Sequence, residues 1–133
     1  MIALVLDTHA AIWLLHGDSR LSRHALEQID AATQRGMQIA ISSLSLVETA
    51  YLEEKGRIPV GTLEGLLALL SSAEPVLVEV PVTRHIIQDL MRISRISVPD
   101  MPDRVIAATA LSLGVPLVSR DGQIQDSEVV TVW

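Results

Sequence analysis

Short apolar runs alternate with amphipathic stretches along this chain, and that alternation is the feature that most restricts its fold. Residues 2–6 are continuously apolar, as in a strand buried on both faces, and further β-prone runs cover residues 38–42, 76–80, 115–119 and 129–133. Between these runs, apolar residues recur at helical spacing. Strands that alternate with helices predict an α/β fold with a central, mostly parallel sheet flanked by helices.

Six helices are expected between the strands. Ser22 is a candidate N-cap, and glycines follow three of the helices as stop signals. Residues 59–72 are rich in leucine and apolar on more than one face, so part of this surface is expected to meet a partner or a second copy of the chain. Asp121 and Gly122 are expected to form a turn. The six helices are expected over residues 8–15, 22–35, 43–55, 59–72, 83–94 and 103–113.

Size and composition indicate one domain. The chain has 133 residues and no internal repeat or linker, so residues 1–133 are expected to fold together. Nearly half of the residues (49%) are hydrophobic, which argues against disorder, and the core must be aliphatic because Phe is absent.

The sequence shows no feature of a membrane or secreted protein. No apolar run reaches the ~18 residues of a membrane-spanning helix, and the N-terminus lacks the basic start of a signal peptide. There is no cysteine for a disulfide or a thiolate metal site. The expectation is therefore a cytoplasmic protein without a membrane partner.

Four acidic residues far apart in the sequence are expected to meet at one edge of the sheet. Asp7 follows the first strand, and Glu48 lies in the helix after the second strand. Asp103 begins a later helix, and Asp121 follows the fourth β-prone run. Ligands of open parallel sheets bind beyond the carboxyl ends of the strands. Crowded carboxylates repel each other unless a cation neutralises them, and Mg²⁺ or Mn²⁺ prefers oxygen ligands. The four acids are therefore candidate metal ligands and catalytic residues for phosphodiester cleavage.

Each acid also has a purely structural explanation. Asp7 could cap the first helix, and Asp121 could simply form a turn with Gly122. Ser45 and Glu48 have the spacing of a capping box, as do Asp100 and Asp103. Independent caps would not need to share one edge of the sheet, which favours the metal-site interpretation. No G-x-G-x-x-G, Walker A or G-x-S-x-G motif offers a different chemistry.

Small hydroxyl residues stand beside the acids. Thr8, Ser43 and Ser119 are expected to orient the carboxylates from behind, although Ser43 and Ser119 could equally be plain helix caps. His9 follows closely, but its helical position points it elsewhere, so a packed histidine is expected.

The charge balance bears on nucleic-acid binding. Net charge is −6, from 10 basic and 16 acidic residues, which argues against a general nucleic-acid binder. This argument against nucleic-acid binding is weaker if several of the acids bind divalent cations. Arg104 is a candidate contact to a substrate phosphate, with a solvated helix arginine as the alternative, and Arg120 has the same two interpretations.

Several segments of the chain match the sequence pattern of a known family. The chain resembles the PIN-domain ribonucleases, and in particular the VapC toxins of prokaryotic type II toxin–antitoxin systems. The resemblance covers essentially the whole chain in order, and residues 102–110 are its most specific part. The matching segments are LDTH at 6–9 with Trp13, ISSLSLVE at 41–48 with Gly56-Arg57, PDRVIAATA at 102–110, LVSRD at 117–121 and the terminal TVW.

The resemblance implies a PIN domain with Mg²⁺- or Mn²⁺-dependent endoribonuclease activity. Asp7, Glu48 and Asp103 would be metal-site acids, and Asp121 the more variable fourth acid, acting through water. An RNA substrate, a cognate antitoxin and a homodimer are implied as partners, with the leucine-rich helix as one dimer surface. The family often has Asp-Pro-x-Asp where this chain has Asp-Met-Pro-Asp, so Asp100 is at most an auxiliary acid.

Other classes of protein remain open from the residues. Phospho-acceptor signalling domains also gather acids around Mg²⁺, but they need a lysine near the C-terminal strands, and the only lysine is Lys55. A catalytically silent metal- or partner-binding α/β module would keep the acids as caps alone. DNA cleavage is also open, because the metal chemistry does not require a 2′-hydroxyl.

Overall fold

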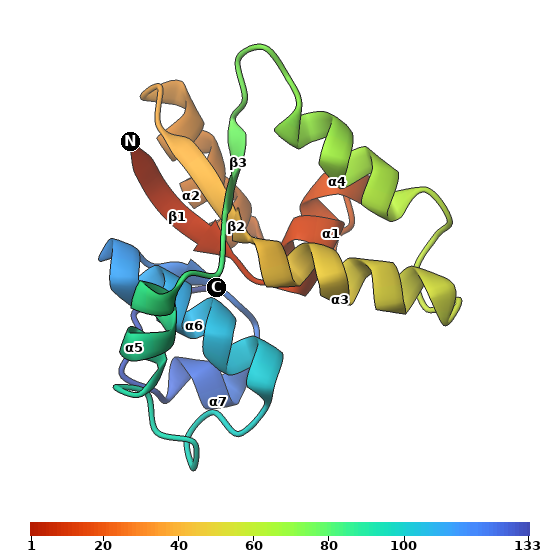
Figure 1. The fold of residues 1–133 in the computed structure, drawn as a ribbon. Helices are drawn as coiled ribbons and strands as arrows, with labels where there is room; N and C mark the ends of the chain where they lie inside the picture. The colour runs from red at the N-terminus through yellow and green to blue at the C-terminus, as the bar shows by residue number, and fades with distance from the viewer.

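Five parallel strands form one sheet in the order β3-β2-β1-β4-β5, so the first strand of the chain lies at its centre. A computed structural model describes all of residues 1–133 (Figure 1). The expected α/β fold with a central parallel sheet is confirmed. The strands are β1 (Ile2–Leu6), β2 (Gln38–Ser42), β3 (Leu77–Val80), β4 (Leu117–Val118) and β5 (Thr131–Val132).

Seven helices surround the sheet and include the crossovers that parallel strands require. The side chains of Asp7, Ser22, Ser42 and Asp100 cap the helices that follow them by accepting hydrogen bonds from first-turn amides. The helices are α1 (Thr8–His16), α2 (Arg23–Gln34), α3 (Ser43–Glu54), α4 (Thr62–Leu70), α5 (Arg84–Leu90), α6 (Met101–Leu113) and α7 (Gly122–Gln125).

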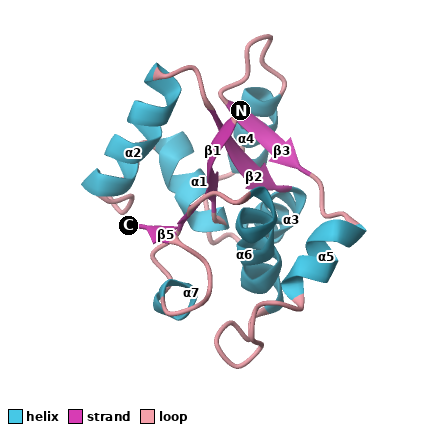
Figure 2. Cartoon of the chain, turned by 90° about the vertical axis from the view of Figure 1, so that its left-hand side faces the viewer, coloured by secondary structure: helices cyan, strands magenta, loops and turns pink.

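Helices cover both faces of the sheet, and successive strand residues point into two separate cores. Leu4 and Leu6 of β1 belong to the core built with α1, α2 and α4, whereas Val5 belongs to the core built with α5, α6 and α7. Figure 2 shows α2 and α5 on opposite sides of the sheet. Val5 and Leu6 have no exposed surface, and burying each such side chain stabilises the fold by about 2 kcal/mol.

A crevice is expected beside β1, because the strand order changes direction there. β2 lies on one side of β1 and β4 on the other. The chain that leaves β1 enters α1 on one face, and the chain that leaves β4 enters α7 on the other. The two connections therefore diverge at the carboxyl ends of the strands, which is where open α/β sheets bind ligands.

Several helices differ from expectation for local reasons. α5 ends at Leu90 rather than near Ser94, because the next three amides bond to carbonyls only three residues back. α6 begins at Met101, because Asp100 is its cap. Asp121 starts the short helix α7 rather than an isolated turn, since its carboxylate accepts two amides of the following residues.

The helices are also short. α4 begins at Thr62 rather than at Pro59, because Gly61 before it adopts a φ of +92°, outside the helical range. The longest helix, α6, has 13 residues, and none of the seven combines the length and apolarity that crossing a bilayer demands.

Candidate active site

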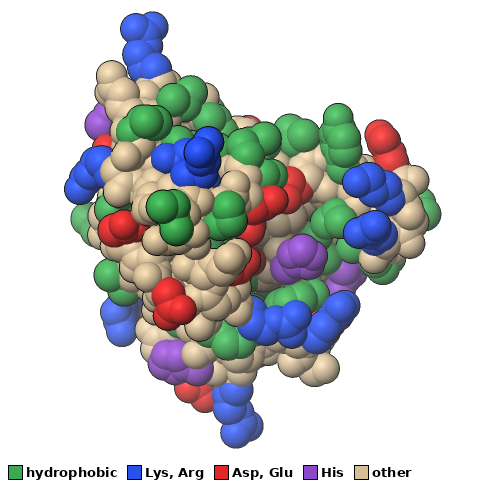
Figure 3. Space-filling view, turned by 90° about the horizontal axis from the view of Figure 1, so that it is seen from below, with side chains coloured by type: hydrophobic (Ala, Val, Ile, Leu, Met, Phe, Trp, Pro, Cys, Tyr) green, Lys and Arg blue, Asp and Glu red, His purple; other side chains and the backbone are tan.

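An open cleft of about 370 Å³ lies beyond the carboxyl ends of β1 and β4. Five carboxylates line this acidic cleft, together with one arginine, one histidine and one tryptophan. Figure 3 shows acidic side chains gathered in a hollow near the middle of one face, with a histidine beside them and basic side chains at its margin. The lining residues are Asp7, His9, Trp13, Glu48, Asp100, Asp103, Arg120 and Asp121.

Asp7 lies at the junction of β1 and α1 and both caps the helix and faces the cleft. Its Oδ1 accepts a hydrogen bond from the amide of Ala10 at 2.8 Å. Burial raises the pKa of Asp7. The bonds from Ala10 and Ser119 and the nearby His9 oppose that rise, whereas Asp121 adds to it. Asp7 is therefore a helix cap and part of the cleft lining at the same time.

Glu48 projects from α3 and is held by Thr8 rather than by its own helix. Thr8 Oγ1 donates to Glu48 Oε1 at 2.6 Å. Ser42 is the cap of α3, so Ser45 and Glu48 do not form the capping box that their spacing allowed. Burial raises the pKa of Glu48, the Thr8 hydroxyl lowers it in part, and the charge of Asp100 raises it further.

Asp103 has a pKa far above its usual range. It lies in the first turn of α6, where its amide donates to the carboxylate of Asp100 at 3.2 Å. Burial is the largest cause that raises the pKa of Asp103, which reaches about 7. Repulsion from the other four cleft carboxylates adds to the rise; these are Asp100, Asp121, Glu48 and Asp7. The acids from separate parts of the chain therefore interact electrostatically.

Asp121 and the buried Ser119 complete the wall that follows β4. Asp121 Oδ1 accepts hydrogen bonds from the amides of Gln123 at 2.8 Å and Ile124 at 3.3 Å, which caps α7. The amide of Asp121 donates to Ser119 Oγ at 3.1 Å. The same hydroxyl is hydrogen-bonded to the carboxylate of Asp7. Ser119 thus links the carboxyl ends of two neighbouring strands.

Two residues expected at the site make their side-chain hydrogen bonds elsewhere. Ser43 Oγ donates to a carboxylate oxygen of Glu79 on β3 at 2.5 Å, so it does not orient the cleft acids. Arg104 Nε donates to the carbonyl of Ile93 at 3.0 Å and thereby ties α6 to the preceding loop. Neither residue lines the acidic cleft.

Three lining residues were given no clear role on sequence grounds: His9, Trp13 and Arg120. His9 and Trp13 lie one turn apart on α1 with ring centroids 5.7 Å apart, and the Arg120 guanidinium lies 4.8 Å from the centroid of Trp13. The expectation that His9 points away from the site is wrong. The spacing of four residues between His9 and Trp13 is the signal that predicts their shared helix face.

Comparison with known proteins assigns the fold to a family. The family model of the PIN domain matches residues 4–128, which is nearly the whole chain. The chain belongs to the PIN-domain family. The family match and the parallel sheet agree on a single kind of fold.

Relatives of this PIN domain are similar to it over most or all of its length. Ribonuclease VapC22 of Mycobacterium tuberculosis is 29% identical over 136 residues, with 100% of both chains covered. A crystal structure of VapBC2 from Rickettsia felis, bound to a DNA fragment from their promoter, has a TM-score of 0.71 at 17% identity and covers 98% of this chain and 97% of that one. A toxin–antitoxin complex from Klebsiella pneumoniae has a TM-score of 0.58 at 20% identity, with 90% and 87% covered.

The donor set of this PIN domain suits a hard divalent cation, although its side chains do not converge on one point. No three acidic or histidine side chains stand close enough to hold a metal ion as they are. Thr8 bonds only Oε1 of Glu48, which leaves Oε2 without a hydrogen-bond partner. Every buried polar side-chain atom has a partner, so this free oxygen is exposed to the cleft. Carboxylates that raise one another's pKa gain stability from a cation. The residues therefore fit Mg²⁺ or Mn²⁺ by their oxygen donors and their charge.

Proposed function

We propose that this PIN domain is a metal-dependent endoribonuclease and the toxin of a toxin–antitoxin pair. The observation that carries the proposal is the state of Asp103, whose pKa rises to about 7 among four other carboxylates in one open cleft. Ionising such a group costs free energy unless a cation offsets the repulsion. Ionised carboxylates that are unfavourable together without a cation become favourable when a divalent ion binds. Such a site is suited to recruiting that ion together with a phosphodiester.

In the proposed site, Asp7, Glu48 and Asp103 would hold Mg²⁺ or Mn²⁺, and Asp121 would assist them through water. When bound, the ion lowers the pKa of a coordinated water and offsets negative charge on the phosphate. Each carboxylate has a defined support for this role. Thr8 orients Glu48, and Ser119 supports Asp7 while bonding the backbone of Asp121.

The chain's own residues supply positioning rather than a side-chain base. His9 is exposed at the rim and lowers the pKa of both Asp7 and Glu48, so it favours their ionised, metal-binding forms. Arg120 makes no ion pair in the cleft and is available to a phosphate oxygen. Attack by water in line with the leaving oxygen leaves a 5′-phosphate and a 3′-hydroxyl.

The relatives support the biological context of the proposal. The Mycobacterium tuberculosis relative is named a ribonuclease, and the two structural neighbours are described as VapBC2 and a toxin–antitoxin complex. By analogy, a cognate antitoxin is proposed to bind this chain and to cover the acidic cleft. A homodimer is also proposed, with the exposed side of α4 as its contact surface.

End-group analysis of cleaved RNA tests the proposal. Purified, partner-free protein is incubated with a mixed RNA pool in Mg²⁺, in Mn²⁺ and in EDTA, and the fragment ends are determined. Discrete fragments that require metal and carry 5′-phosphates are expected. Fragments that end in a 2′,3′-cyclic phosphate would show attack by the 2′-hydroxyl and would contradict the proposed mechanism.

A catalytically silent metal- or partner-binding module is the second candidate, and one observation favours it. The acids do not stand close enough together to hold an ion as they are. Each of Asp7, Asp100 and Asp121 also has a sufficient structural role as a helix cap. Calorimetric titration that detects no binding of Mg²⁺ or Mn²⁺, together with no cleavage of RNA or DNA, would favour this module over the nuclease.

A further inference from the structure

A second cavity of about 320 Å³ adjoins the acidic cleft and differs from it in chemistry. The two cavities share His9 and Trp13 as lining residues, so they lie next to each other along α1. The volume lies in the range of pockets that hold small organic ligands. We call this second space the side cavity, and its charged or aromatic lining residues are His9, Trp13, His16, Asp18, Arg20 and Arg57.

Helix α1 builds the side cavity with one face. His9, Trp13 and His16 follow the spacing of residues that lie on one side of a helix. Gly17 ends α1 with a φ of +61°, and the turn after it carries Arg20 back over Trp13, at 5.2 Å from the ring centroid. This packing fixes a guanidinium beside the cavity.

The charge reverses between the two spaces. The acidic cleft has five carboxylates against one arginine. The side cavity has one carboxylate, Asp18, against Arg20 and Arg57 and two histidines. A polyanion that crosses both spaces therefore meets repulsion in the metal-free cleft and attraction beside it.

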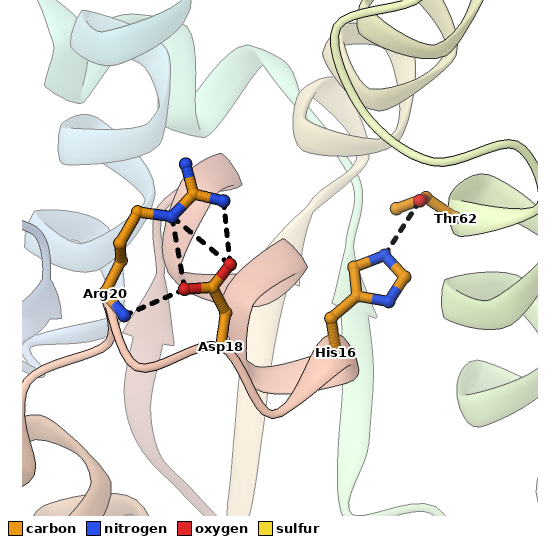
Figure 4. A network of polar contacts seen from close by, with 4 residues as sticks. All are labelled: His16, Asp18, Arg20 and Thr62. Atoms are coloured by element: carbon orange, nitrogen blue, oxygen red, sulfur yellow. Dashed lines mark hydrogen bonds and ion pairs between the residues drawn. The ribbon is translucent and has the colours of Figure 1, made fainter.

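Arg20 is held in a fixed orientation, and Arg57 is free. Asp18 accepts from Arg20 Nη2 at 2.7 Å and from Nε at 3.1 Å, which leaves Arg20 Nη1 without a partner (Figure 4). Arg57 is exposed, follows α3, and takes part in no ion pair. Its charge is therefore not cancelled within the protein.

The neighbouring histidine has a defined proton. Thr62 Oγ1 gives its only proton to the carbonyl of Pro59 at 2.6 Å. His16 Nε2, which lies 2.9 Å from the same oxygen, must therefore donate to it (Figure 4). Nδ1 of His16 has no partner and is left for a ligand group.

We infer that the side cavity binds a nucleotide of the RNA strand adjacent to the phosphodiester in the acidic cleft, with its phosphate on Arg57 and Arg20. The inference rests on the proposed function and extends it to the placement of the substrate. Single-stranded nucleic acids are held by cationic grooves that follow the backbone. In a chain of net charge −6, that attraction must come from a local group of cations.

Arg57→Ala is the cleanest probe of the side cavity, because Arg57 takes part in no ion pair that its loss would break. Arg35→Ala is the matched control. Arg35 is also exposed, but it lies near the amino ends of β1 and β4, at the opposite edge of the sheet. Both variants remove one positive charge. Any difference between them reports position rather than total charge.

The experiment measures binding of a labelled, mixed-sequence single-stranded RNA by anisotropy over a series of KCl concentrations. Binding is measured in the Asp7→Asn background, and cleavage kinetics are measured in the otherwise unaltered chain. Arg57→Ala is expected to weaken binding about fivefold and to reduce the slope of log K against log salt by about 0.7. KM should rise by the same factor with kcat unchanged, since Arg57 lies outside the acidic cleft. Arg57→Lys should restore most of the salt slope.

Equal behaviour of Arg57→Ala and Arg35→Ala would overturn the inference while leaving the nuclease proposal intact. Failure of the unaltered chain to cleave any RNA would count against the proposed function alone. In that case, Arg57-dependent binding by the Asp7→Asn protein would still support the side cavity as an RNA site.

Discussion

Asp103 is the residue whose charge state most directly couples the fold to the proposed chemistry. In the unfolded chain its carboxyl loses a proton near the ordinary pKa of 3.8, whereas in the fold it holds the proton to about 7. The unfolded state therefore binds fewer protons between these values. The metal-free protein should lose stability as pH rises from about 4 to about 7, and metal affinity should rise over the same range because the ion needs the ionised form.

Asp103→Asn should separate stability from activity. Removing the charge avoids the cost of burying it and relieves repulsion from four carboxylates, so at neutral pH the metal-free variant should gain about 1 kcal/mol after allowance for partial solvent exposure, or roughly 4 °C in Tm. RNA cleavage should fall by at least about 100-fold, because a metal-site carboxylate is lost. Thermal melts at several pH values and a cleavage assay make the comparison. A variant that melts lower than the parent at neutral pH would contradict the assigned repulsion.

Thr8 and Ser43 form a matched pair for the hydroxyls near the acids. Thr8→Val removes the hydrogen bond to Glu48 while keeping the shape of the side chain, so activity should fall roughly 10-fold or more. Ser43→Ala removes a bond to Glu79 on an exposed part of β3 and should leave kcat unchanged. Equal losses in the two variants would show that the hydroxyls act through the fold and not through the cleft.

These residues also show which parts of the site a sequence can predict. Asp7 and Asp121 were predictable because they lie just beyond β1 and β4, whose carboxyl ends must share an edge. Arg104 was assigned because it directly follows Asp103, but on a helix adjacent residues point about 100° apart. Side-chain direction, not sequence distance, sends Ser43 toward β3 and Arg104 toward the loop before α6.

At the scale of elements, α4 carries the surface most suited to a second copy of the chain. Gly65 lies against α1, where an added Cβ would come within 3.0 Å of Leu15, so this side of α4 is packed. Leu67, by contrast, lies on the side of α4 away from Gly65 and is 43% exposed. Apolar side chains on an unpaired helix face are typical of an interface.

Leu67→Glu should therefore weaken the proposed homodimer without unfolding the monomer. Ile96→Glu is the control, since Ile96 is 92% exposed on the loop before α6, away from α4. Sedimentation at several concentrations is expected to show a dimer for the parent and for Ile96→Glu, and a shift to monomer for Leu67→Glu. A parent chain that stays monomeric at all concentrations would remove the dimer proposal.

Element types followed from the sequence more readily than their limits. The strands were found because β-branched and aliphatic runs pack well between helices. The end of α5 was not predictable, because the three residues after Leu90 switch to shorter-range hydrogen bonds that have no sequence signal. α7 was expected as a turn, since Asp-Gly favours turns and helix caps alike.

For the molecule as a whole, the topology assembles the site that no single segment contains. β1 and β4 bring Asp7 and Ser119 together, α3 contributes Glu48, and α6 contributes Asp103. In a chain of net charge −6, the acidic cleft and the basic side cavity have linings of opposite charge and suit different parts of the proposed reaction. One space suits a metal ion, and the other suits the strand on which the ion acts.

The measurement that tests this most directly compares the parent chain with Asp7→Asn in RNA cleavage, with Mg²⁺ or Mn²⁺ and with EDTA. Asparagine still accepts the Ala10 amide as a helix cap, so the variant should keep its fold, which circular dichroism can verify. Discrete fragments from the parent that disappear in EDTA and in Asp7→Asn are predicted. Cleavage that persists in EDTA, or in a folded Asp7→Asn protein, would contradict a carboxylate-bound metal as the centre of this activity.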